Sequence, residues 1–87
     1  MHFTVEERHL TDTSGRPIAT PYAVEFHQCD GENVDDAVRL YIIDAKAELI
    51  GDVLKFPGFN AVATVRKATG VYTLQFTPAS ERGVPLR

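Results

Sequence analysis

The sequence predicts an α+β domain, an antiparallel sheet of four or five strands with one long helix packed on one face, in the order ββαββ. Three observations predict this fold. Two segments near each end of the chain alternate apolar and polar side chains, which is typical of strands that bury one face. Between these pairs, residues 34–54 repeat apolar side chains at helical spacing. Clusters of turn-forming residues separate the segments.

The first predicted strand covers residues 2–10, where Phe3 and Val5 share one face. A cluster of turn formers at 11–17 follows it. The second strand is predicted from residue 18 to about residue 28. Pro21 favours an edge position or a bulge for this strand, because proline cannot donate to a strand ladder. One face of the strand would carry Ile18, Tyr22, Val24 and Phe26.

A helix is expected from Val34 onwards. Asn33 can accept from the first free backbone amides, and two aspartates in the first turn suit the positive end of a helix. Two positions are possible for the C-terminal end of this helix. Gly51 can end the helix as a left-handed cap, which would make residues 52–56 a strand and change the order to ββαβββ. Otherwise the helix runs to Pro57.

Two further strands are predicted over residues 59–66 and 71–77, where alternation is clearest. The apolar face carries Phe59, Ala61, Ala63 and Val65 in the first strand and Tyr72, Leu74 and Phe76 in the second. Gly70 fits the left-handed position of a bulged hairpin turn between them. Residues 1–87 would form a single domain, because a chain of this length allows no more. Residues 79–87 show no pattern, so we expect a flexible tail.

The predicted helix is apolar on two opposite sides, although a helix on a sheet needs only one apolar stripe. The second stripe consists of Leu40, Ile43, Ala47, Ile50 and Leu54. Burying one Leu or Ile side chain is worth roughly 1.5–3 kcal/mol, so leaving this stripe in water would forfeit several kcal/mol. No second helix is predicted that could cover it. We therefore expect these five residues to form an interface with a second copy of the chain.

Three alternatives to this homodimer remain open. The helix could end at Gly51, so that Leu54 belongs to the sheet. The C-terminal tail, with Val84 and Leu86, could fold over the stripe. A different protein could be the partner. In each case the expected function is that of a non-catalytic interaction, assembly or regulatory module.

Composition excludes several other classes of protein. The net charge is −3 and the nine basic residues are scattered, which disfavours nucleic acid as a partner. The sequence has no run of about 18 apolar residues and an acidic N-terminus, so we expect no membrane segment, no signal peptide and a cytoplasmic location. Cys29 is the only cysteine, so one chain cannot form a disulfide.

Candidate chemistry is confined to the end of the second strand. His27 and Cys29 would point to one face, with Asp30 and Glu32 beyond them, and these are residue types that bind zinc. A structural zinc site needs four ligands, however, and a thiolate nucleophile needs a base within hydrogen-bond reach. The sequence therefore predicts no catalytic residue, no metal and no cofactor. The alternative is a metal- or small-molecule-binding domain, including a small enzyme, with a site near His27 and Cys29.

Overall fold

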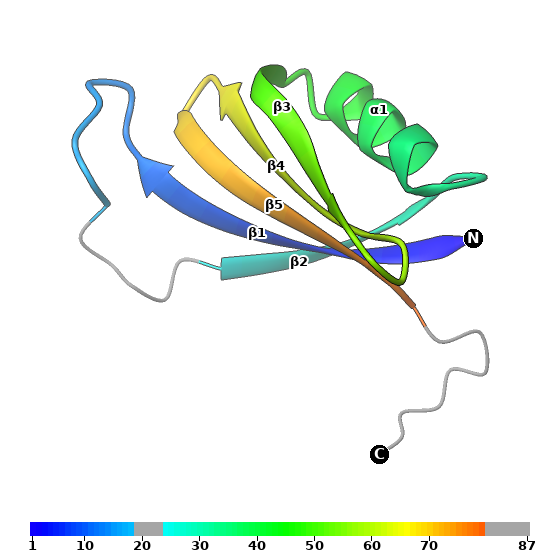
Figure 1. Ribbon diagram of the computed structural model, residues 1–87. Coiled ribbons are helices and arrows are strands. Elements are labelled where there is room, and N and C mark those ends of the chain that lie inside the picture. Colours follow the sequence, from blue (N-terminus) through cyan, green and yellow to red (C-terminus); the bar gives the residue numbers. More distant parts are fainter. Residues whose placement is uncertain (19–23, 80–87) are drawn as a thin grey trace.

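The structure is a computed structural model that describes residues 1–18 and 24–79 of the 87-residue chain. The described residues form one helix and a five-stranded sheet (Figure 1). The elements in chain order are β1 (His2–Thr11), β2 (Val24–Asp30), α1 (Val34–Asp44), β3 (Glu48–Phe56), β4 (Asn60–Lys67) and β5 (Gly70–Pro78). Within these residues, no helix is long and apolar enough to cross a membrane.

The strands are arranged in the order β2-β1-β5-β4-β3, and all neighbours are antiparallel. The N-terminal strand β1 therefore pairs with the last strand β5, and β2 and β3 form the two edges. The predicted antiparallel sheet with a helix is confirmed. The predicted order ββαββ is wrong, because residues 48–56 form a strand and the order is ββαβββ.

The predicted long helix is also wrong, because α1 ends at Asp44. Lys46 adopts a left-handed conformation with φ 55°. Its amide donates to Ile43 and the Ala47 amide donates to Ile42, which is the Schellman pattern of a helix end. Lysine rather than glycine occupies the left-handed position, so the sequence offered no obvious stop signal there. Gly51, with φ 74°, lies in the irregular middle of β3 instead of capping the helix.

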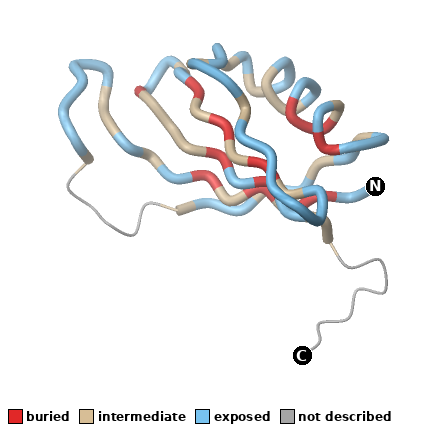
Figure 2. Tube along the Cα trace, viewed as in Figure 1, coloured by how far each residue is buried: buried red, intermediate tan, exposed pale blue. Residues whose placement is uncertain are grey.

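The hydrophobic core lies between α1 and one face of the sheet (Figure 2). Alternation predicted the sheet side of this core correctly: Phe3, Val5, Ala61, Ala63, Val65, Leu74 and Phe76 are all buried. Val34, Ala37 and Val38 of α1 complete the cluster. The two alanines of β4 leave room for the helix backbone to approach the sheet closely. Phe59 departs from the pattern, because it lies in the β3–β4 turn with φ 63° and is exposed.

In β2, the side chains that point to the helix are not those of the predicted apolar face. Cys29 packs against the core and His27 lies near Tyr41 of the helix, so both point to the helix side. Alternation then puts Val24 and Phe26 on the opposite face of the sheet. Of the predicted apolar set, Tyr22 lies outside the described residues, as does the predicted tail from residue 80 onwards.

Candidate functional site

The five predicted interface residues lie on different parts of the chain. Leu40 and Ile43 are exposed on α1, and Ala47 packs against the core just before β3. Ile50 and Leu54 lie on β3, on the face of the sheet that points away from the helix. They cannot form one helical stripe, because α1 ends before Ala47. An interface through these residues stays a prediction, but the residues lie on a helix and a strand and not on one helix.

Strand β3 instead carries apolar side chains on both sides, interspersed with the charged Glu48, Asp52 and Lys55. On the helix side, an open groove of about 310 Å³ runs between α1 and β3 and is lined mainly by Ile42, Ile43, Leu49 and Val53. On the other side, Leu54 and Phe56 are about half exposed. An edge strand normally carries charged or polar residues that discourage association. The apolar side chains of β3 therefore identify this edge as a candidate contact surface.

The face of the sheet opposite the helix is not covered by any described element (Figure 1). One row of side chains crosses it from edge to edge in the register Phe26, Glu6, Gln75, Val62, Leu54. The row is polar in the middle and apolar at both ends. Phe26 on β2 is 67% exposed and Leu54 on β3 is 57% exposed. Both edges of this face thus present large apolar side chains to solvent.

A second candidate region lies on the helix side of the sheet, around Glu7 of β1. Glu7 follows Phe3 and Val5 on the buried face and is itself only 4% exposed. Its carboxylate pairs with Lys67 Nζ at 2.6 Å and with His27 Nε2 at 3.2 Å. A buried charge is stable only with such partners. We call Glu7, Glu25, His27 and Lys67 the Glu7 corner.

His27 connects the two carboxylates of this corner. Its Nε2 lies 3.2 Å from Glu7 Oε1 and 3.5 Å from Glu25 Oε1. Its ring lies against Tyr41 of α1, with 5.8 Å between the ring centres. Burial and the nearby Glu7 carboxylate raise the pKa of Tyr41 to about 12, so this phenol stays neutral.

The outer side of the Glu7 corner is held by aromatic contacts. Lys67 Nζ lies 4.5 Å above the ring of Tyr72, and His9 stacks on the same ring at 4.1 Å. His9 Nε2 also lies 3.0 Å from the Thr69 carbonyl oxygen, and the Tyr72 and Thr69 hydroxyls are hydrogen-bonded. These contacts fix Lys67 beside Glu7 and leave it little freedom to bind another group.

The predicted pair of His27 and Cys29 does not form a thiol–base couple. The side-chain nitrogen of His27 faces carboxylates, as described above. Burial, together with the neighbouring Asp30 carboxylate, raises the pKa of the Cys29 thiol, which disfavours the reactive thiolate. His2 pairs with Asp30 at the exposed end of the strands, away from His27 along β2. The candidate site on this side of the sheet is therefore centred on Glu7 and not on Cys29.

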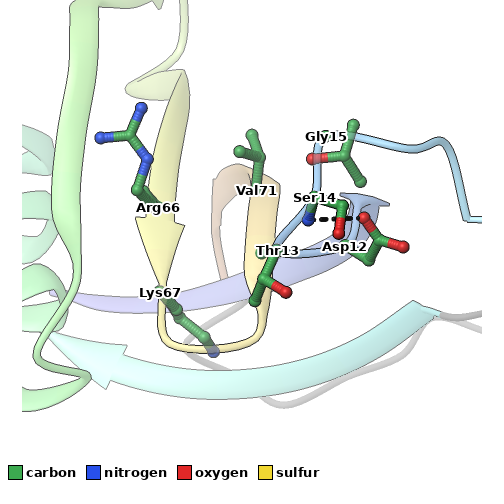
Figure 3. A pocket seen from close by; sticks show the side chains of 9 residues that line it. Asp12, Thr13, Ser14, Gly15, Arg66, Lys67 and Val71 are labelled. Carbon is green, nitrogen blue, oxygen red and sulfur yellow. Dashed lines mark hydrogen bonds between the residues drawn. The ribbon is translucent and has the colours of Figure 1, made fainter.

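A hollow of about 390 Å³ lies between the 12–15 turn and the end of the β4–β5 hairpin (Figure 3). Its two cations are already neutralised, because Arg66 pairs with Glu48 and Lys67 pairs with Glu7. Asp12 accepts from the Ser14 and Arg16 amides and so stabilises the turn. Among the described residues, the hollow offers no unpaired cation for a ligand.

Sequence reasoning missed Glu7 and Glu25, although one signal could have found Glu7. The alternation of β1 places Glu7 on the same face as Phe3 and Val5, so this pattern indicates a buried carboxylate. Glu25 could not be assigned, because its proximity to Glu7 depends on the β1–β2 register.

Two regions of the structure thus carry functional interest: the uncovered sheet face with its apolar edges, and the Glu7 corner. Comparison with known proteins adds no assignment to either of them. No protein-family model, curated protein or solved structure matches this chain.

Proposed function

We propose that the chain is a homodimeric assembly module in which the uncovered sheet faces of two copies pack against each other. The observation that carries this proposal is the row from Phe26 to Leu54, with exposed apolar side chains at both ends. Val24 and Ile50 repeat the pattern in the next row, on the same two edge strands. Apolar groups at both edges of one open face favour a partner that covers the whole face.

A second copy fits this face because of where the apolar edges lie. β5 is the central strand, with β1 and β2 on one side and β4 and β3 on the other. A two-fold axis along β5 would place the β2 edge of one copy over the β3 edge of the other. Phe26 would then meet Leu54 of the second copy, and Gln75 of the central strand would meet its own counterpart. Such self-complementarity is what an isologous dimer requires.

The gain in free energy is of the right size for association. Leu54, Phe56 and Phe26 are each about half to two-thirds exposed. Burying them in both copies would contribute on the order of 5–10 kcal/mol before the loss of free motion is subtracted. The product would be a two-layer sandwich with the sheets about 10 Å apart. We expect assembly in the micromolar range.

Sedimentation equilibrium at micromolar concentration tests the proposal. The unmodified chain should have the mass of a dimer, and the double variant Phe26→Glu with Leu54→Glu should be monomeric, because charges would be buried without partners. Both side chains are exposed, so the fold should survive. The matched control is Leu40→Glu with Ile43→Glu on α1, which should remain a dimer. A monomeric unmodified chain would refute dimerisation.

The control pair also distinguishes the two possible interfaces. If the α1 variant becomes monomeric and the Phe26/Leu54 variant stays dimeric, the helix surface is the interface and the sheet face is not. Disulfide trapping then tests the axis. In a Cys29→Ser background, a chain with Phe26→Cys and Leu54→Cys should cross-link efficiently. Each single cysteine variant should cross-link poorly. Efficient trapping by Leu54→Cys alone would instead place the β3 strands of two copies together.

A further inference from the structure

We infer that Glu7, Glu25 and His27 form a Zn²⁺ site that ties β1 to the edge strand β2. This inference is independent of the proposed dimer, because the three side chains lie on the helix side of the sheet. One ligand atom from each of them lies within 4.8 Å of the other two. The site would bind an ion with nitrogen and oxygen ligands and leave one position for water.

The distances around His27 Nε2 suit a metal ion as well as a hydrogen bond. The nitrogen lies 3.2 Å from one carboxylate oxygen and 3.5 Å from the other. A hydrogen bond from this nitrogen reaches Glu7 Oε1, while Glu25 Oε1 lies at the limit of hydrogen-bond distance. Zn²⁺ bonds of 2.0–2.2 Å in a tetrahedral arrangement separate neighbouring ligands by about 3.3–3.5 Å. The two distances from His27 Nε2 therefore match the spacing between neighbouring ligands of one zinc ion.

The β1–β2 register gives a second reason. Glu7 and Glu25 are direct cross-strand partners, and like charges at such positions are destabilising unless a cation lies between them. Glu7 is 4% exposed, so its negative charge is not screened by water. Lys67 binds the other oxygen of Glu7, Oε2, and leaves Oε1 directed at His27. A charged neighbour that orients a ligating carboxylate is usual beside metal ligands.

The ligand types favour Zn²⁺ over Ca²⁺ and Mg²⁺, and the exposure of the site allows the ion to enter. An imidazole ligand suits Zn²⁺ and is not used by Ca²⁺ or Mg²⁺, which prefer oxygen ligands alone. Glu25 and His27 have side chains that are 73% and 38% exposed, so the ion can reach the site from solvent. The two strands hold the ligands in place before binding, which lowers the cost of ordering them.

Isothermal titration of the untagged, chelator-treated chain with ZnCl₂ tests the site. We expect saturable uptake of one Zn²⁺ per chain and a rise in melting temperature, because the metal binds the folded state. CaCl₂ and MgCl₂ should produce neither effect. Absence of saturable uptake would overturn the inference.

Variants identify the ligands. Glu25→Gln and His27→Gln should each weaken Zn²⁺ binding by on the order of 10–100-fold, and both side chains are exposed enough for the fold to survive. The controls are His2→Gln on the same pair of strands, and Cys29→Ser. Both controls should bind Zn²⁺ as the unmodified chain does. Binding that survives the first two variants and is lost in a control would refute the site.

Cobalt gives a spectroscopic test of the ligand atoms. Co²⁺ in the site should show the d–d absorption of a four-coordinate ion without a thiolate-to-metal charge-transfer band, because no sulfur is a ligand. A charge-transfer band that disappears in Cys29→Ser would refute the proposed ligand set. Sedimentation in the presence of chelator separates the two proposals, since the dimer should persist when Zn²⁺ is removed.

Discussion

Glu7 shows how one residue can depart from a strand's pattern without disturbing the fold. The side chain replaces a third apolar residue on the buried face of β1, and it is accepted because Lys67 neutralises it and His27 lies within hydrogen-bond distance. An unpaired carboxylate in this position would be strongly destabilising. Lys67 lies on β4 and His27 lies on β2, so the stability of the Glu7 charge depends on two strands besides β1.

Removing Lys67 should therefore destabilise the protein more than removing an exposed cation. We expect Lys67→Met to lower the free energy of unfolding by about 2 kcal/mol, because it leaves Glu7 partly unpaired. Arg66→Met, the control, removes an exposed pair with Glu48 and should change stability by less than about 0.5 kcal/mol. Urea unfolding with chelator present measures both. Equal effects would contradict a buried role for Glu7.

The double variant Glu7→Leu with Lys67→Met provides a further check on the same pair. Both charges are then gone, and an apolar pair often replaces a buried ion pair without loss. We expect most of the stability lost in Lys67→Met to return.

Tyr41 predicts a specific response to alkali. Its pKa is raised to about 12 in the folded chain, by burial first and then by the Glu7 carboxylate, whereas the unfolded value is about 10. As the pH rises, Tyr41 loses its proton in the unfolded state before it does so in the folded state. The contribution of Tyr41 to the free energy of unfolding is therefore complete below pH 10 and is lost as the pH rises towards 12. Tyr41→Phe should remove the part of the stability loss at alkaline pH that is due to Tyr41. Unfolding free energies at several pH values test it, and an unchanged profile would contradict the assignment.

At the scale of elements, α1 is defined at its two ends by different means. Asn33 accepts from the Asp36 amide at 2.9 Å, and Asp36 accepts in return from the Glu32 amide at 3.0 Å. The Glu32 hydrogen bond and Arg39 lower the pKa of Asp36, so the cap weakens only when the pH falls below the usual range of aspartate. The other end depends on Lys46 in a left-handed conformation. Sequence reasoning found the first end and missed the second.

Two glycines of the sheet should respond differently to the same substitution. A Cβ on Gly70 would overlap the Thr11 carbonyl oxygen and lie 2.9 Å from His9 Nε2, where β5 approaches the end of β1. We expect Gly70→Ala to cost about 3 kcal/mol of unfolding free energy. Gly51 has φ 74° and no atom within 4 Å, so Gly51→Ala should cost only about 1 kcal/mol.

Urea unfolding of the two alanine variants provides the comparison. Equal losses would mean that the close approach of Gly70 to β1 is relieved by a small shift of the chain. A larger loss for Gly70 would confirm that the β1–β5 contact is tightly packed at this point.

At the scale of the whole molecule, the proposed dimer links stability to concentration. A sheet face that is covered only by a second copy makes the folded state more stable as the chain becomes more concentrated. We expect the melting temperature to rise by several degrees between about 1 and 100 µM. Differential scanning calorimetry measures it. The Phe26→Glu with Leu54→Glu variant should melt at one temperature throughout, and a constant value for the unmodified chain would argue against assembly.

The prediction from sequence succeeded where the pattern is local. Alternation located the strands at both ends of the chain and identified Phe3, Val5, Leu74 and Phe76 as core residues. It failed over residues 45–56, because apolar residues at helical spacing there also suit a strand. The fit of β3 against β4 decided between the two, and that contact is not visible in the local pattern.

The sequence by itself determined the faces of β1, β4 and β5 and the start of the helix, since each follows from the spacing of neighbouring residues. Only the tertiary structure decided that β1 pairs with both β2 and β5, that Glu7 meets Glu25 and His27, and that Phe26 and Leu54 share one open face. The physical reason is the sheet register. Pairing between distant strands sets which side chains become neighbours, and it depends on the packing of the whole chain.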